Sequence, residues 1–382
     1  MTERLFDENA YLTEFTANVL ETKPSDDGKF LILLDKTAFF PEGGGQFPDL
    51  GILDDAAVLD VQEDKQGNIW HKCEKDFTAG QCIFGKIDFE RRFDFMQQHS
   101  GEHIFSGLAH NHFGATNVGF HLGTDIVTID LDVPLGEEDI NTLEAEANDA
   151  IYKNLPIEIS YPTPEELKQI PYRSKKELAG KIRIVTIPGY DICACCGTHV
   201  AKTGEIGIVK IISHQNYKGG TRFTMLCGKR ALLDYQRKNH DVNKVTVGLS
   251  VKPEELCSAV ERLENDITER KIYESALRNE LFELKTASLS GEKAILFESG
   301  LSPDEIRRFC LAATEKVGIA AVFCGKDGEW KYAIASKEKN CNDIAKAVNS
   351  EFSGRGGGKP ELVQGSCFGT RAEIEIFFSK LQ

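Results

Sequence analysis

The 382-residue sequence has no long hydrophobic run, which limits where the protein is expected to work. No stretch of about 18 apolar residues occurs, and the first residues, MTERLFDENAYLTEF, are polar and acidic. The sequence therefore predicts neither a membrane-spanning helix nor an export signal, and we expect a cytoplasmic protein with no membrane partner. It also has no internal repeats, so it does not indicate a repeat architecture.

The regular cysteine pattern of a secreted, disulfide-linked fold is absent too. The eleven cysteines are an odd number, and most are scattered singly, as expected for small buried apolar side chains. Cys193, Cys195 and Cys196 are the exception, because they lie together with His199 in DICACCGTH. Such a cluster indicates metal binding. Within it, Cys193 and Cys196 form a CxxC pair that could serve a purely structural zinc ion, with Cys195 as a bystander.

Positive charge is scarce over the whole chain. The net charge of -15 argues against a nucleic-acid partner, because most of the affinity for a polyanion comes from neutralising its phosphates. The window from Lys168 to His240 differs, with fourteen Lys or Arg against four Asp or Glu. This window is either a basic surface that binds nucleic acid or a solvated face paired with acidic stretches such as 130–149.

The spacing of apolar residues predicts an α+β protein in four parts. Residues 1–90 alternate short apolar runs with Gly, Asp and Pro breaks, which predicts short strands closing into a small β-barrel or a sandwich, and the barrel is our expectation. Residues 91–242 combine helical and strand patterns and form a predicted α+β domain. Residues 243–290 contain a long helix, and residues 291–382 alternate strands and helices in a predicted α/β domain.

The long helix carries a coiled-coil-like stripe. Nine positions step by four and three along it: 256, 260, 263, 267, 270, 274, 277, 281 and 284. Seven of them are apolar, and only Arg270 and Glu274 interrupt the stripe. Such a stripe packs either in a helical hairpin or against a second copy of the chain, so a homodimer is one expectation.

The glycine-rich segment 353–366, SGRGGGKPELVQGS, superficially resembles a phosphate-binding loop. However, Lys359 is followed by Pro360, so the hydroxyl residue that would hold magnesium is missing. Glycines still allow close approach of a polyanion to the backbone. Contact with a nucleic acid and a tight structural turn are therefore both open.

Two residue pairs form a split pattern of metal ligands. His99 and His103 lie on one face of a predicted helix, with side chains about 6 Å apart. Cys195 and His199, again four residues apart, add a thiolate and a third imidazole. Together these four residues predict a Zn²⁺ site.

A metallopeptidase is an alternative interpretation of the two histidines. His99 to His103 spell H-x-x-E-H, the inverzincin signature, in which a glutamate, here Glu102, activates a zinc-bound water. Such an enzyme takes a third ligand from a downstream helix, for which Glu144 and Glu146 are the only candidates. CCGTH would then have no role, so the pattern favours the four-residue site.

Five motifs, in order, resemble the editing and C-terminal portions of alanyl-tRNA synthetase. They are TAFFPEGGGQFPDLG (37–51), HSGEH (99–103), CCGTH (195–199), TGEIG (203–207) and GRGGGKPELVQGS (354–366). The chain resembles the long form of the AlaX trans-editing proteins still more closely, over essentially its whole length. The resemblance implies zinc-dependent hydrolysis of the ester in tRNA(Ala) mischarged with serine, and perhaps with glycine. It does not imply aminoacylation, because the motifs belong to the editing and C-terminal portions.

The resemblance also implies which residues form the site. The family's zinc ligands correspond to His99, His103, Cys195 and His199, and its glycine motif to Gly43, Gly44, Gly45 and Gln46. The loop that shapes the amino-acid pocket corresponds to GATNVGFHLG, which offers Thr116, Phe120 and His121. Here Cys196 replaces a glycine of the common CGGTH spelling and adds a competing thiol. The last domain resembles the C-terminal domain of the synthetase, and this resemblance implies a role in tRNA binding and dimerisation.

Chemistry suggests roles for several of these residues. Four protein ligands fill a tetrahedral site, which is typical of structural zinc. Either the zinc ion expands to five ligands, or it positions the substrate while a nearby base activates water; Glu102 and His121 are the candidate bases. A pocket whose polar group needs the serine hydroxyl rejects alanine, and Thr37, Gln46 or Thr116 could supply that group. If the zinc were purely structural, the chain would instead be a non-catalytic tRNA-binding protein.

Overall fold

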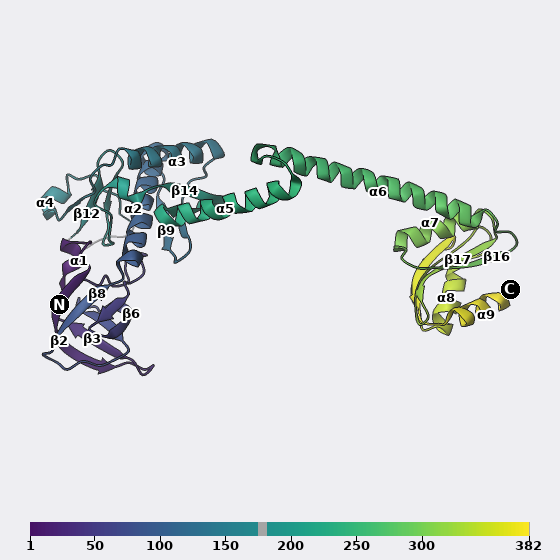
Figure 1. Ribbon diagram of the computed structural model, residues 1–382, viewed down its shortest axis with the longest axis horizontal. Coiled ribbons are helices and arrows are strands. Elements are labelled where there is room, and N and C mark those ends of the chain that lie inside the picture. Colours follow the sequence, from purple (N-terminus) through teal and green to yellow (C-terminus); the bar gives the residue numbers. More distant parts are fainter. Residues whose placement is uncertain (175–181, 382) are drawn as a thin grey trace. The chain divides into compact units, whose positions relative to one another are not determined.

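The computed structural model describes residues 1–174 and 182–381 of the chain (Figure 1). The fold is a mixture of helices and sheets, which confirms the predicted α+β class. The chain divides into two compact units, Met1–Lys244 and Val245–Gln382. None of the helices in the described ranges combines the length and the hydropathy needed to cross a membrane.

The first unit begins with a closed β-barrel, which confirms the predicted small barrel. Buried and exposed side chains alternate along its strands, as they do in β8, so that apolar residues such as Ile32, Leu34 and Val61 fill the interior. Around the barrel the strands are β2 (Glu14–Pro24), β3 (Phe30–Leu34), β7 (Ile69–Cys73), β6 (Ala56–Glu63), β5 (Gly51–Leu53) and β8 (Cys82–Ile87). At the start of the chain, β1 (Glu3–Arg4) pairs with β4 (Lys36–Thr37), and α1 (Leu5–Glu8) follows β1.

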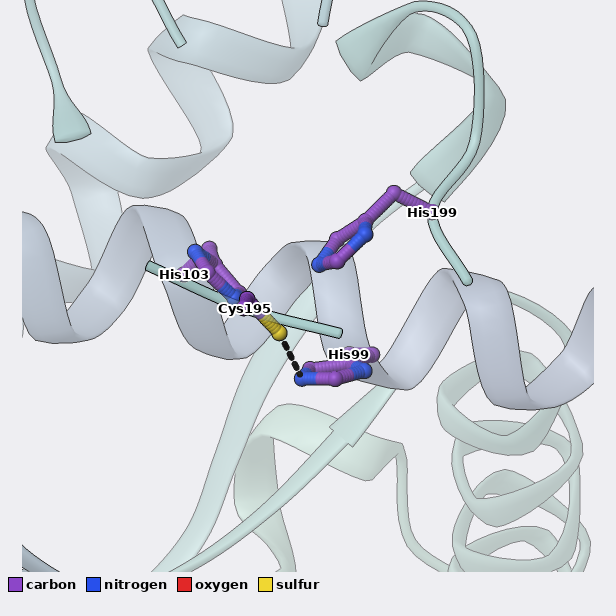
Figure 2. A group of neighbouring side chains, drawn as sticks. All are labelled: His99, His103, Cys195 and His199. Carbon is purple, nitrogen blue, oxygen red and sulfur yellow. Dashed lines mark hydrogen bonds between the residues drawn. The ribbon is translucent and has the colours of Figure 1, made fainter. Parts of the chain in front are cut away.

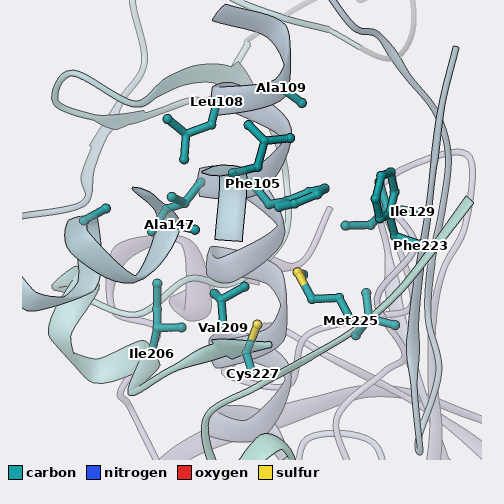
Figure 3. Packing of buried hydrophobic residues seen from close by; sticks show 14 of the residues in the cluster. Phe105, Leu108, Ala109, Ile129, Ala147, Ile206, Val209, Phe223, Met225 and Cys227 are labelled. Atoms are coloured by element: carbon teal, nitrogen blue, oxygen red, sulfur yellow. The ribbon is translucent and has the colours of Figure 1, made fainter. Parts of the chain in front are cut away.

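The long helix α2 (Phe89–Phe113) is the centre of the rest of this unit. Its N-cap Asp88 accepts a hydrogen bond from the backbone of Arg91, and Gly114, with φ of 64°, ends it in the left-handed conformation. Its inner face packs on a sheet and on α3 (Glu137–Tyr152); Phe105, for example, meets Phe223 edge to face (Figure 3). The sheet order is β14 (Val209–Tyr217), β15 (Gly220–Cys227), β10 (Val127–Leu131) and β9 (Asn117–Leu122).

A glycine on α2 lets a second sheet come close. A Cβ atom at Gly107 would lie 2.4 Å from the carbonyl oxygen of Tyr190, so only glycine allows this approach. Tyr190 directly precedes β13 (Asp191–Ala194), which pairs with β12 (Ile184–Ile187) and, beyond it, β11 (Glu158–Ser160). The chain leaving β13 therefore passes beside α2. Also in this region are α4 (Pro164–Leu167) and the 3₁₀ turn η1 (Thr203–Ile206), and α5 (Gly228–Leu249) follows β15.

The second unit combines a long helix with a five-stranded sheet. The helix α6 (Leu256–Thr286) lies within the predicted helical segment and follows a short 3₁₀ turn, η2 (Pro253–Glu255). Near its end, Phe282 stacks on Phe309 of α7 (Pro303–Thr314), with ring centroids 4.6 Å apart. The sheet order is β16 (Lys293–Glu298), β17 (Ile319–Lys326), β18 (Glu329–Ser336), β20 (Leu362–Cys367) and β19 (Arg355–Lys359). The other helices are α8 (Cys341–Glu351) and α9 (Arg371–Lys380).

The glycine-rich segment of this unit is a β-hairpin. Its three consecutive glycines lie in the exposed edge strand β19, which pairs with β20. A Cβ atom at Gly356 would lie 2.5 Å from the hydroxyl oxygen of Tyr332, so glycine is needed there for close packing. Of the two open expectations, the structure supports a structural turn and leaves contact with tRNA a prediction.

Candidate metal centre

The four predicted zinc ligands come together in the first unit. Ligand atoms of His99, His103, Cys195 and His199 all lie within 4.8 Å of one another (Figure 2). The two α2 residues are one turn apart, and the other two belong to the loop that follows β13. The imidazole rings converge, with centroids 4.6 to 5.2 Å apart, and all three histidines are buried.

His99 is oriented by the glycine motif of the barrel. Its Nδ1 lies 3.2 Å from Oε1 of Gln46, which can only accept, so Nδ1 carries the proton and donates. The Gln46 amide is fixed in turn by Thr198, whose hydroxyl accepts from Nε2 and whose backbone N–H donates to Oε1. The other ring nitrogen, Nε2, then faces Cys195 Sγ at 3.4 Å. A partner of this kind on the outer ring nitrogen is typical of a metal-binding histidine.

His103 is oriented by a buried carboxylate. Its Nδ1 lies 2.8 Å from Oδ2 of Asp191, and Arg173 donates to both oxygens of the same carboxylate, at 2.8 and 3.0 Å. Burial is the largest influence on the pKa of His103 and lowers it, but hydrogen bonds to Asp191 and Cys195 raise the pKa to about 10. Asp191 and Arg173 were not predicted from the sequence. The only signal was the position of Asp191, four residues before Cys195.

Cys195 is held as a thiolate by its surroundings. Burial is the largest influence on its pKa and raises it, yet the neighbouring His99, His199 and His103 bring the pKa well below its usual value of 9.0. Cys193 differs, because burial raises the pKa of its thiol and keeps it protonated. A second group, His103, Asp191 and Cys193, also lies within 4.8 Å, but Arg173 already occupies the carboxylate. The geometry therefore favours the four-residue group.

His199 shows that the cluster fits a metal ion. Both of its ring nitrogens are buried, and neither has a hydrogen-bonding partner among the described residues. A buried imidazole without partners is costly unless it binds something. Three imidazoles and one thiolate form a donor set that suits Zn²⁺.

The backbone of the ligand loop is also adapted to this position. A Cβ atom at Gly197 would lie 2.2 Å from the His99 ring, so the glycine of CCGTH is needed where the loop crosses that ring. The buried Arg183 donates hydrogen bonds to the carbonyl oxygens of Cys195 and Gly197 and so fixes the backbone of the loop.

The glycine motif forms a tight turn next to the cluster. Gly43 and Gln46 exchange two backbone hydrogen bonds, of 3.1 and 3.0 Å, and Gly44 and Gly45 between them have positive φ angles of 63° and 86°. A Cβ atom at Gly45 would lie 2.9 Å from the Phe120 ring. Phe120 in turn stacks on His99, with ring centroids 5.4 Å apart and the planes inclined by 26°. The turn, Phe120 and the metal cluster thus pack as one group.

The structure does not gather the other predicted site residues at the cluster. Thr37 is buried in the barrel, where its hydroxyl lies 2.8 Å from His71 Nε2, and Thr116 is exposed. His121 is exposed and packs edge to face against Phe47. Their predicted roles stay predictions.

Glu102 is enclosed within the protein rather than placed in the ligand group. Its Oε1 accepts hydrogen bonds from the hydroxyl of Ser106 at 2.6 Å and the amide of Asn117 at 2.5 Å. Its proposed role as a base therefore also stays a prediction.

Many charges of the basic window are neutralised within the fold. Seven of its basic residues form ion pairs, including Lys210 with Glu144 and Arg222 with Asp130; the others are Arg173, Lys229, Arg230, Arg237 and Lys238. Residues 175, 176 and 181 lie outside the described part of the chain. Among the described positions, the ion pairs favour the interpretation of a paired, solvated face.

The chain is similar in sequence to proteins that act on or edit alanyl-tRNA by their names. The family described as "Threonyl and Alanyl tRNA synthetase second additional domain" matches residues 182–224, which include the loop with Cys195 and His199. The bovine "Alanyl-tRNA editing protein Aarsd1" is 34% identical over 67% of this chain and 62% of its own length. "Alanyl-tRNA editing protein Aarsd1-B" of Xenopus laevis is 28% identical, with coverage of 98% of this chain and 96% of its own.

Longer enzymes are similar too. The "Alanine--tRNA ligase" of Pyrococcus furiosus is 31% identical over 95% of this chain, which spans only 42% of the ligase. The chain therefore spans less than half of that relative. A solved structure, the C-Ala domain of Aquifex aeolicus alanyl-tRNA synthetase, is 17% identical and covers 24% of this chain and 87% of its own, with a TM-score of 0.21.

Proposed function

Because this chain belongs to the family of alanyl-tRNA editing proteins, we propose that it is a zinc-dependent deacylase that hydrolyses the ester of mischarged Ser-tRNA(Ala), with Gly-tRNA(Ala) as a second candidate substrate. The observation that carries the proposal is the cluster of three buried imidazoles and one thiolate within 4.8 Å. In this proposal tRNA(Ala) is the partner. An aminoacyl ester is more reactive than an amide, so modest catalysis is sufficient.

His99, His103, Cys195 and His199 would hold the zinc ion. When bound, Zn²⁺ would polarise the ester carbonyl or hold the amino group of the substrate. Gln46 and Asp191 fix the ring orientations of the first two ligands, which keeps their inner nitrogens directed at the cluster.

The neighbouring residues would shape the amino-acid pocket. Phe120 covers one face of His99 and is itself held by the turn at Gly45, so its ring is placed to limit the size of the bound side chain. Thr198 and Gln46 lie beside His99 and would offer polar groups to a serine hydroxyl. A site that needs this hydroxyl would spare correctly charged Ala-tRNA(Ala). His121 stays a candidate base on the resemblance alone.

The decisive experiment compares Ser-tRNA(Ala) and Ala-tRNA(Ala) as substrates of the wild-type protein, with and without a chelator. We expect release of serine but not alanine, loss of this activity with the chelator, and its recovery on adding Zn²⁺. His103→Ala should be inactive, whereas His112→Ala, which changes an exposed histidine on the same helix, should match the wild type. Undiminished deacylation by zinc-free His103→Ala protein would refute the proposal. Binding of tRNA without turnover would instead identify a non-catalytic tRNA-binding protein.

A further inference from the structure

The carboxylate of Glu102 lies at the centre of a buried polar group. Ser106, one turn later on α2, donates to Oε1 at 2.6 Å, and Asn117 donates to the same oxygen at 2.5 Å. Asn117 also lies 3.2 Å from the hydroxyl oxygen of Ser106. The three residues are between 1% and 5% exposed, so these hydrogen bonds are shielded from water. Bonds to a shielded carboxylate are among the strong ones in proteins.

Asn117 connects this group to the strand beside the metal cluster. It is the first residue of β9, and its Oδ1 accepts the backbone N–H of Gly119 at 3.2 Å. Phe120 is the next residue and stacks on His99. A chain of direct contacts thus runs from Glu102 through Asn117 to the ring that borders the proposed pocket.

Two contacts of Glu102 tie its carboxylate to the protein itself. A general base must reach the proton that it removes, directly or through one water molecule. The hydrogen bonds from Ser106 and Asn117 direct Oε1 of Glu102 to its own helix and to β9, and Glu102 is not one of the four residues of the ligand group.

We propose that Glu102 is a positioning residue: through Asn117 it holds the start of β9, and so keeps Phe120 against His99. This inference rests on the proposed deacylase function for its kinetic consequence. Its structural content, the link between Glu102 and the β9 backbone, is independent of that function.

Glu102→Gln and Glu102→Ala separate the two roles. Glutamine keeps an oxygen that can accept from Asn117 and Ser106, whereas neither glutamine nor alanine can act as a base. For a positioning residue we expect Glu102→Gln to retain kcat/KM within about fivefold of the wild type. Glu102→Ala and Asn117→Ala should each lose about 20-fold or more, mainly through KM, because each leaves a buried partner unsatisfied. The double alanine variant should lose little more than either single variant.

A base would give a different order of activities. Glu102→Gln would then lose about 10²- to 10⁴-fold in kcat, as much as Glu102→Ala, while Asn117→Ala would be far milder. That result would overturn the proposal.

Hydrogen exchange of the peptide that contains residues 117–122 tests the link without any substrate. Exchange should be faster in Glu102→Ala and Asn117→Ala than in the wild type, and unchanged in Glu102→Gln. Unchanged exchange in both alanine variants would refute the positioning role. If hydrogen exchange differs between the wild type and the variants as expected, but the wild type hydrolyses no aminoacyl-tRNA, the proposed function fails and the positioning role stands.

Discussion

Single residues outside the ligand set are expected to control how tightly the metal binds. Asp191 fixes His103 through Nδ1 and is itself neutralised by Arg173. Replacing such an outer partner typically weakens metal affinity about 10- to 100-fold. Asp191→Asn should therefore lose Zn²⁺ to a competing chelator at a correspondingly lower chelator concentration. Asp149→Asn, which changes an exposed aspartate of α3, is the control, and equal zinc affinities in the two variants would show that Asp191 has no such role.

His71 is expected to make the stability of the first unit depend on pH. It is buried in the barrel, and burial lowers its pKa from 6.5 to about 4. Between these values the unfolded chain binds a proton that the folded protein excludes, so stability falls as the pH drops from about 6.5 to 4. The total loss is about 3 kcal/mol.

The measurement is urea unfolding of the wild type and His71→Gln at several pH values from 4 to 7. Glutamine can keep the hydrogen bonds to Thr37 and the Ile32 carbonyl, but it does not titrate. Because other groups titrate alike in both proteins, the difference in unfolding free energy isolates His71. Parallel pH profiles would contradict the prediction.

At the scale of elements, the segment between β4 and β5 links the barrel to α2 and to the metal cluster. Its base is closed by Phe40 and Asp49, which share two hydrogen bonds, and Asp49 forms a fully buried ion pair with Arg92 of α2. Arg92 also donates to the carbonyl oxygens of Ala10 and Ala38. At its tip the same segment carries Gln46. One short segment is thus anchored on α2 at its base and on the ligand His99 at its tip.

Breaking the buried ion pair should destabilise this element strongly. Asp49→Asn leaves the Arg92 charge buried without its counter-charge, which typically costs about 3 to 5 kcal/mol. We expect a loss of that order in urea unfolding, together with a raised KM, because Gln46 and Gly45 lose their anchor. The pair Arg92→Met with Asp49→Leu should be less destabilised than Asp49→Asn. Removing both charges should thus cost less than removing one. If Asp49→Asn unfolds at the same urea concentration as the wild type, the anchor is unimportant.

The sequence predicted the candidate metal cluster better than the residues that support it. His99, His103, Cys195 and His199, which the structure brings together, were predicted because four-residue spacings and resemblance to a family both mark them. Asp191, Arg173 and Asn117 were not, because their contacts join segments far apart in the chain and no local pattern encodes them. Thr37 was expected in the pocket because it begins the glycine motif. Spacing could not show that its hydroxyl meets His71 in the barrel.

The fold was predictable to a similar extent. Alternation of apolar residues gave the barrel, and the four-and-three spacing gave the helix now seen as α6. The sequence could not decide between tRNA contact and a structural turn for the glycine-rich segment, because glycine permits both an exposed loop and a tightly packed strand.

For the whole molecule, the unpaired stripe of α6 predicts a dimer. Six of its seven apolar positions are solvent-exposed, with exposed fractions from 41% to 68% at Val260, Leu263, Ile267, Leu277, Leu281 and Leu284. Antiparallel pairing with a second copy can place Leu263 opposite Leu281 and Arg270 opposite Glu274, so that the two charges interrupting the stripe face each other. We predict a homodimer formed in this way.

Light scattering at several protein concentrations tests this assembly. Leu263→Glu places a charge in the stripe and should lower the molar mass to that of one chain. Ile272→Glu is the matched control, because Ile272 is 67% exposed on the same helix but off the stripe. A wild-type protein of monomeric mass at all concentrations, or equal effects of both substitutions, would contradict the prediction.

The split origin of the ligands also has a consequence for biosynthesis. His99 and Cys195 are 96 residues apart in the chain. At a synthesis rate of about 5 to 20 residues per second, roughly 5 to 20 s pass between them. Throughout that interval, the nascent chain presents two histidines without the thiolate that would complete the set. The proposed zinc ion would therefore lock this domain only after the loop with Cys195 and His199 has left the ribosome, so metal capture would be a late step in its folding.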